Sequence, residues 1–245
     1  MSGGCAISIN AQLSAVGNLR APGISKVGRT KALLGCGVAA TLLYVGTDLL
    51  AASLYDGYSY TDQTISELSA VGAPTRSLWI PLGVVYSVLT VACGFGIWAS
   101  AGRKRALRFV AVFVSGIGIL GLVAWPFAPM HQREVLAAGG GTLSDTVHLM
   151  LGAADTFLFV LSIACGATAF GKRFRLYSIA TIFFVLAFGA LTGMDAPRVA
   201  DNERTPWVGI TERIAVFGSM LWIAVLAIAL LRARDAPPGT SGGQP

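Results

Sequence analysis

The chain of 245 residues is 54% hydrophobic and only 12% charged, with a net charge of +6. A soluble domain carries about 25% charged residues, so this composition excludes an ordinary soluble domain and indicates a membrane protein. The basic residues cluster between apolar segments, which is a pattern of membrane topology rather than of nucleic-acid binding. We therefore expect the lipid bilayer as a partner, and no nucleic acid.

Residues 1–32 are rich in Gly, Ser and Ala and end in basic residues, so they are predicted to form a flexible cytoplasmic tail. Apolar runs of about 17–25 residues can cross a bilayer as helices. The chain has six of them: Leu33–Leu54, Ser77–Ala101, Phe109–Met130, Asp145–Phe170, Leu176–Met194 and Thr211–Leu231. The expected fold is all-α, a polytopic membrane protein with a bundle of six transmembrane helices over residues 33–231. Residues 232–245, rich in Pro, Gly and Ser, are expected to be a disordered cytoplasmic tail.

The loop between the first two apolar runs is predicted to hold a short helix at the outer membrane surface. Residues 64–67 read Thr-Ile-Ser-Glu, which fits a capping box whose hydroxyl and carboxylate bond to backbone N–H groups. The side chains of Ile65, Leu68 and Val71 would then face inward. Glu67 is either a structural cap or a carboxylate of a pocket, and the pattern leaves both roles open.

The fourth apolar run carries three ionisable residues, Asp145, His148 and Asp155. Their spacings of three and seven residues place them on one face of a helix. Ionisable groups inside a bilayer normally face the bundle interior or a water-filled cavity. We expect the three side chains to line one outward-opening cavity, closed above by the short first-loop helix.

Arg213 lies at the outer end of the last apolar run, where the positive-inside rule disfavours a basic residue. We expect it to form a partly buried ion pair with a carboxylate of the outer half, Glu67 or Asp145. Asp48, about two-thirds of the way along the first run, is open to two interpretations. It is either a hydrogen-bonded residue near a helix end or part of a pocket.

Basic residues settle the expected orientation, because 13 of the 18 fall on one side of the membrane if there are six spans. They are Arg20, Lys26, Arg29, Lys31, Arg103, Lys104, Arg105, Arg108, Lys172, Arg173, Arg175, Arg232 and Arg234. By the positive-inside rule that side is the cytoplasm. We therefore expect a multi-pass protein of the plasma (inner) membrane with both termini in the cytoplasm.

Three parts of the chain resemble the motifs of an uncharacterised multi-pass family, the domain of unknown function 998. They are residues 64–74 (TISELSAVGAP), residues 126–131 (PFAPMH) with 145–148 (DTVH), and residues 209–214 (GITERI). The resemblance covers about residues 33–231 and implies a six-helix membrane bundle. It places Glu67, His131, His148, Glu212 and Arg213 within family motifs, and it implies no activity.

Three classes of function fit these residues. The first, which we favour, is the binding of a small molecule or lipid in an outward-facing polar cavity. Its candidate ligand-binding residues are Glu67, His131, Asp145, His148, Asp155 and Arg213. The second is an intramembrane hydrolase or other acid/base enzyme, with catalytic candidates Glu67, Asp145, His148, Asp155 and Glu212. The third is a proton-coupled transporter that uses His148 and Asp155 as protonatable groups.

Metal binding has a narrower basis. His131 and His148 are the only histidines and therefore the candidate metal ligands. A catalytic zinc site has three protein ligands, so a carboxylate would have to complete the set. We expect no metal and no other cofactor.

Overall fold

The computed structural model describes residues 25–235. Six helices in this range are long and apolar enough to cross a membrane, and they confirm the prediction of an all-α six-helix bundle. They are α2 (Lys26–Leu54), α3 (Arg76–Ala101), α4 (Arg105–Val123), α6 (Leu143–Gly166), α7 (Lys172–Ala200) and α8 (Val208–Asp235).

The helices extend further at the two ends of the chain than the apolar runs do. The expected tails lie mostly outside the described residues, but residues 26–32 are helical in α2 and residues 232–235 in α8. Lys and Arg are good helix formers, so a helix continues beyond the apolar segment that crosses the bilayer. The side chains of Lys31, in the second turn of α2, and Asp235, the last residue of α8, form an ion pair.

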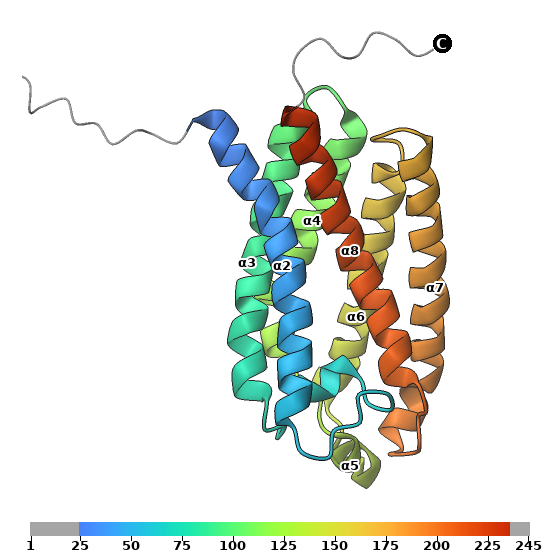
Figure 1. Ribbon diagram of the computed structural model, residues 1–245. Coiled ribbons are helices and arrows are strands. Elements are labelled where there is room, and N and C mark those ends of the chain that lie inside the picture. The colour runs from blue at the N-terminus through green and yellow to red at the C-terminus, as the bar shows by residue number, and fades with distance from the viewer. Residues whose placement is uncertain (1–24, 236–245) are drawn as a thin grey trace, which may run out of the picture.

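The six helices run side by side along a common direction (Figure 1), and their contacts form a closed ring. Helices that follow each other in the chain pack side by side, from α2 through α3, α4, α6 and α7 to α8. Helix α8 then packs against α2 and closes the ring. Short connections explain part of this order, from α3 to α4 and from α6 through α7 to α8, because a short loop joins antiparallel neighbours.

One half of the ring is filled by an apolar core that includes Leu34, Ile97, Ile163, Trp222 and Leu226. These residues are on α2, α3, α6 and α8, in the half of the bundle where the chain enters and leaves. The indole N–H of the buried Trp222 donates to the hydroxyl of Ser178 on α7 at 2.9 Å. This half therefore offers packing and little polar chemistry.

Close helix contacts depend on small residues. A Cβ atom added to Gly96 of α3 would lie 2.8 Å from the backbone nitrogen of Leu34 on α2. One added to Gly118 of α4 would lie 2.7 Å from the carbonyl oxygen of Ser87 on α3. Small residues let membrane helices approach closely enough for dispersion forces to hold them together.

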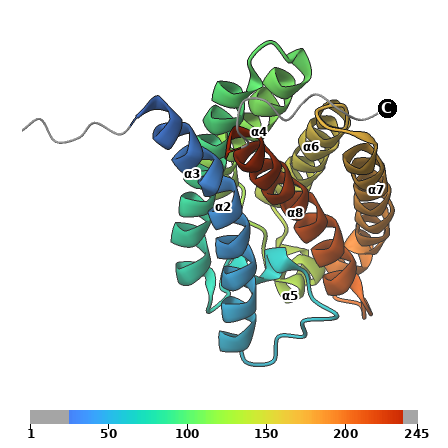
Figure 2. The ribbon, with the colours of Figure 1, turned by 45° about the horizontal axis from the view of Figure 1, so that its top comes forward.

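Short elements fill the other end of the ring. They are η1 (Ile65–Ser69), η2 (Trp125–Phe127), α5 (Arg133–Val135) and η3 (Leu136–Gly140). The 3-10 helix η1 contacts α2, α3 and α8, so it lies in the mouth of the ring (Figure 2). Ile65 and Leu68 are buried as predicted, whereas Val71 is exposed because it follows η1 and pairs with His131 in a β-bridge.

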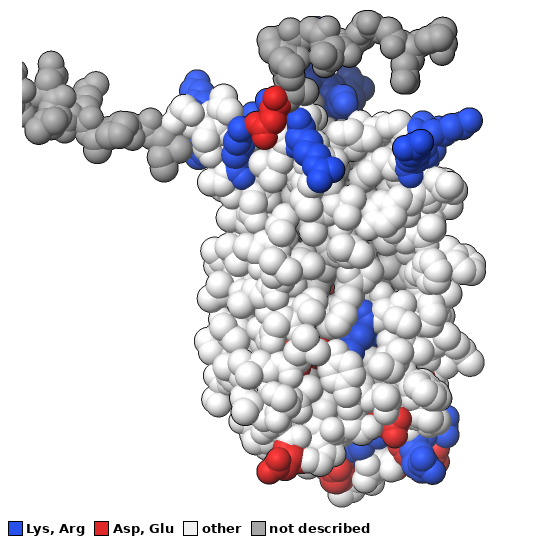
Figure 3. All heavy atoms as spheres, in the orientation of Figure 1, with Lys and Arg blue, Asp and Glu red and all other residues white. Residues whose placement is uncertain are grey.

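Charged side chains separate along the bundle axis (Figure 3). Lysines and arginines gather at the end where α2 begins and α8 ends, and acidic and basic side chains mix at the opposite end. The broad surface between them is almost entirely uncharged, as the hydrocarbon region of a bilayer requires. A few charged atoms are nevertheless visible in a hollow of this surface, in the half that contains η1.

Candidate functional site

The end of the ring that holds η1 is built from segments far apart in the sequence. The N–H group of Val71 donates to the carbonyl oxygen of Met130 at 2.8 Å, which joins the first loop to the segment after α4. The N–H group of Ile65 donates to the carboxylate of Glu212 on α8. Glu212 therefore holds the start of η1 in place, a structural contact for a residue expected among the catalytic candidates.

Arg213 of α8 forms a two-point ion pair with Asp48 of α2. Its Nε and Nη2 atoms lie 3.0 and 2.9 Å from the two oxygens of the Asp48 carboxylate. Both side chains are buried, and Nη2 also donates to the Tyr58 hydroxyl at 2.8 Å. The prediction of an ion pair for Arg213 is confirmed, although the pair is fully rather than partly buried, and the expected partners, Glu67 and Asp145, were wrong. Asp48 takes this place because α2 and α8 are neighbours that close the ring.

Tyr60 covers this ion pair. Its hydroxyl donates to Asp48 at 2.8 Å, and its ring centroid lies 3.6 Å from the guanidinium carbon of Arg213. Burial and the hydrogen bond to the Asp48 carboxylate raise the pKa of the Tyr60 hydroxyl to about 12. The phenol therefore keeps its proton into the alkaline range, where an ordinary tyrosine would lose it, and donates to the carboxylate.

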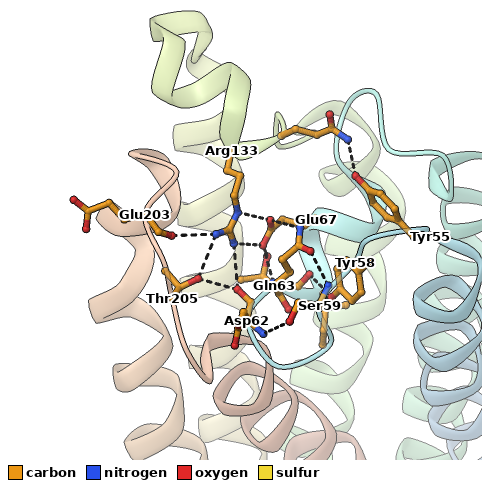
Figure 4. A network of polar contacts seen from close by, with 12 residues as sticks. Tyr55, Tyr58, Ser59, Asp62, Gln63, Glu67, Arg133, Glu203 and Thr205 are labelled. Atoms are coloured by element: carbon orange, nitrogen blue, oxygen red, sulfur yellow. Dashed lines mark hydrogen bonds and ion pairs between the residues drawn. The ribbon is translucent and has the colours of Figure 1, made fainter.

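A second buried ion pair joins Arg133 and Glu67 (Figure 4). The Nε and Nη2 atoms of Arg133 lie 2.7 and 2.8 Å from the two carboxylate oxygens of Glu67. The remaining guanidinium N–H groups donate at 3.3 Å to the carbonyl oxygens of Asp62 and Glu203 and to the hydroxyl of Thr205. This network ties α5 to the first loop and to the loop before α8.

Glu67 has a second role at the start of η1. Its carboxylate accepts the backbone N–H of Thr64 at 2.7 Å, so the predicted capping box is present. Burial alone would lower the pKa of the Arg133 guanidinium, but the Glu67 carboxylate outweighs this effect and raises that pKa. Sequence reasoning missed Arg133, although the argument applied to Arg213 holds for it too. It is also a basic residue at the end opposite to most basic residues.

A cleft of about 420 Å³ opens beside this network. It is lined by loop residues: Tyr55, Asp56, Gly57, Asp62, Gln63, Arg133, Glu134, Asn202, Glu203, Arg204 and Thr205. None of the six predicted ligand-binding residues lines the cleft, but Glu67 supports two lining residues, Arg133 and Gln63, whose side-chain amide donates to the Glu67 carboxylate at 3.0 Å. The backbone of Asn202 has a φ of 53°, which a residue other than glycine adopts at a cost.

Asp145 belongs to the start of α6. Its carboxylate accepts the backbone N–H of Thr142 at 2.8 Å in a second capping box. The same carboxylate accepts the backbone N–H of His131 at 2.7 Å and lies 2.9 Å from Nδ1 of that residue. Asp145 and His131 therefore form one half-buried cluster that holds the segment after η2 against α6.

His148 lies one turn further into the bundle and is 6% exposed. Its Nδ1 atom is 2.9 Å from the carbonyl oxygen of Ala128, and its Nε2 atom is 2.9 Å from Oγ of Ser66. The ring of Trp125 packs edge-on against the imidazole, with 4.7 Å between ring centroids. The indole N–H of Trp125 donates to Oδ2 of Asp155 at 3.2 Å.

These contacts show which residues the predicted polar face of α6 meets. His148 and Asp155 both contact Trp125, whereas Asp145 turns to His131 and Thr142. The Oδ1 atom of Asp155 is buried and has no hydrogen-bond partner within residues 25–235. In the same range no group of three or more His, Cys, Asp or Glu residues is arranged to hold a metal ion.

A ring of six apolar helices with a buried, hydrogen-bonded polar layer at one end defines a multi-pass integral membrane protein. The chain belongs to the family described as "Protein of unknown function (DUF998)", whose model matches residues 38–229. The three family segments named from the sequence are those that meet at this end of the ring. No curated protein and no solved structure matches the chain.

Proposed function

We propose that this membrane protein binds a small organic cation in the cleft beside Arg133, either as a free solute or as the headgroup of a lipid. The proposal rests on the charge of the cleft. Its ionisable lining residues are Asp56, Asp62, Glu134, Glu203, Arg133 and Arg204. Glu67 neutralises Arg133, and Arg198 pairs with Glu203 at 3.5 Å. The carboxylates of Asp56, Asp62 and Glu134 then remain against the guanidinium of Arg204, and a cation is the complementary ligand.

The cleft also has an aromatic wall. The ring of Tyr55 stacks on that of Tyr58 with 5.7 Å between centroids, and Gln132 donates to the Tyr55 hydroxyl at 2.8 Å. An aromatic face next to carboxylates attracts ammonium groups through the ring quadrupole. The volume of the cleft falls in the range of small-molecule sites, which is about 300–1,000 Å³.

The walls of the cleft are held before any ligand arrives. Arg133 connects the first loop, α5 and the loop before α8 through five hydrogen bonds to Glu67, Asp62, Glu203 and Thr205. A preorganised site loses less conformational entropy on binding, so more of the interaction energy appears as affinity.

The orientation of the protein in the membrane follows from the distribution of its basic residues. With most basic residues in the cytoplasm, both termini are cytoplasmic and the cleft faces the outside of the plasma (inner) membrane. The ligand then comes from outside the cell or from the outer leaflet.

Calorimetric titration of the purified protein with choline tests the free-solute form of the proposal. Nanodiscs made with choline-headgroup or glycerol-headgroup phospholipid test the lipid form, with melting temperature as the readout. The double variant Asp56→Asn/Glu134→Gln should weaken choline binding, or remove the stabilisation by choline lipid, by about tenfold or more. Asp235→Asn is the control, because Asp235 pairs with Lys31 at the opposite end of the bundle and does not line the cleft. If neither choline form binds, or if the variants bind equally, the proposal is wrong.

A further inference from the structure

We infer that Ser66 and His148 form a nucleophile–base pair that transfers acyl groups from esters of apolar acyl chains. The inference is independent of the cation site, because neither residue lines the cleft. It rests on the 2.9 Å contact between Oγ of Ser66 and Nε2 of His148, across elements 82 residues apart in the sequence.

The other contact of the imidazole decides which atom carries the proton. The carbonyl oxygen of Ala128 can only accept, so Nδ1 of the neutral His148 ring must donate to it. The Nε2 atom is then the acceptor, and the Ser66 hydroxyl donates its proton to it. This is the arrangement in which a histidine removes the proton of a serine nucleophile, with a backbone carbonyl orienting the ring instead of a carboxylate.

Three elements hold the pair in this geometry. Ser66 is on η1, whose start is fixed by the capping box of Glu67 and by Glu212. His148 is on α6, and the ring of Trp125 from η2 packs against one side of the imidazole. His148 is almost fully buried, whereas Ser66 is partly exposed, so the nucleophile can be reached while the base is shielded from water.

The surroundings of the pair indicate the substrate class. Four large apolar side chains are exposed on η2 and the outer part of α6, namely Phe127, Leu143, Leu149 and Met150, and Thr146 is exposed between them. In a bilayer these side chains contact lipid. A substrate that approaches along this surface carries an apolar chain, and its ester carbonyl lies near the polar end of the bundle, where Ser66 is placed.

The proposed reaction balances with water as the only co-reactant. Oγ of Ser66 attacks the ester carbonyl carbon while its proton moves to Nε2 of His148. The bond from that carbon to the alkoxy oxygen breaks, the leaving alcohol takes the proton from Nε2, and an acyl-Ser66 ester remains. Water then attacks the acyl carbon and gives its proton to Nε2. Ser66 leaves and recovers that proton, so that ester and water yield an acid and an alcohol.

Labelling of the full-length protein in detergent with an alkyl fluorophosphonate, followed by peptide mass mapping, tests the inference. The serine oxygen displaces fluoride, so an activated Ser66 should carry the phosphonate. Ser66→Ala should abolish the label, and His148→Gln should slow it by about 100-fold or more, the usual contribution of a positioned base. Ser69→Ala is the matched control, because Ser69 is the other serine of η1 and its hydroxyl donates to a backbone carbonyl instead.

Hydrolysis of p-nitrophenyl octanoate and p-nitrophenyl acetate gives a second readout. The octanoate should be the better substrate, and Ser66→Ala should reduce its turnover to the rate without protein. If the folded protein is not labelled at Ser66, or if His148→Gln is labelled as fast, the pair is only a structural hydrogen bond and the inference is wrong. Should His148→Gln fail to fold, the peptide map of the unmodified sequence decides the matter.

Discussion

Arg213 and Asp48 neutralise each other inside the bundle, at the contact where α8 closes the ring against α2. The side chain of Arg213 is 4% exposed and that of Asp48 is fully buried. All three guanidinium nitrogens donate hydrogen bonds, since Nη1 reaches the carbonyl oxygens of Tyr60 and Gly209, each at 3.0 Å. A pair this well satisfied holds two helices that short loops do not connect.

Arg213→Ala should lower the melting temperature in detergent by several degrees. The substitution leaves the Asp48 carboxylate buried without its counter-charge, which costs about 3–5 kcal/mol. Arg198→Ala is the control, because Arg198 is half exposed and its two ion pairs, with Asp195 at 3.3 Å and Glu203 at 3.5 Å, lie on the surface. An exposed pair contributes about 0–1 kcal/mol, so the control should hardly change the melting temperature. Equal effects of the two substitutions would show that the buried pair does not support the ring.

The two glycines of α8 should respond differently to alanine. A Cβ atom at Gly209 would lie 2.3 Å from the carbonyl oxygen of Gln63 and 2.5 Å from that of Tyr60. Gly209→Ala should therefore push the first loop away and lower the melting temperature by several degrees. Gly218 has no atom within 4 Å of such a Cβ, so Gly218→Ala should be neutral or raise stability by about 0.5–1 kcal/mol. Thermal unfolding of both variants in the same detergent provides the comparison.

Tyr60 should make stability depend on pH in the alkaline range. Its pKa is about 12 in the fold, whereas an unperturbed tyrosine has a pKa of about 10. Between these values the unfolded chain loses a proton that the fold retains, so the free energy of unfolding falls as pH rises from about 10 to 12. The contribution is fully present below pH 10. Tyr60→Phe should reduce the decrease in melting temperature between pH 9 and 11, and an unchanged decrease would contradict the prediction.

Reporter fusions test the orientation. The positive-inside rule predicts cytoplasmic readings for fusions at Arg103 and Lys172, and external readings at Gly140 and Asn202. The structure makes the four positions informative, because Arg103 and Lys172 follow or begin helices at one end of the ring and the other two lie at the opposite end. An external reading at Lys172 would reverse the orientation and place the cleft in the cytoplasm.

The six spans and the local caps follow from the amino-acid sequence alone. Hydrocarbon thickness imposes a minimum length on each apolar run, so the spans could be read without knowing which helices touch. The capping box at Thr64 and Glu67 was equally predictable, because its two partners are three residues apart. The capping box at Thr142 and Asp145 follows the same rule, and it gives Asp145 a structural role where its helical spacing predicts a cavity residue.

Which polar groups meet depends on how the helices and loops pack in three dimensions. Arg213 pairs with Asp48, 165 residues away, and Arg133 pairs with Glu67, 66 residues away. Helical spacing places a side chain on one face of its own helix, but it contains no information on the neighbour that this face meets or on the relative depth of the two. Ring closure between α2 and α8, and the position of η1 in the mouth of the ring, fix both. The contact of Ser66 with His148 depends on the same two features, and for that reason no local pattern in the chain revealed it.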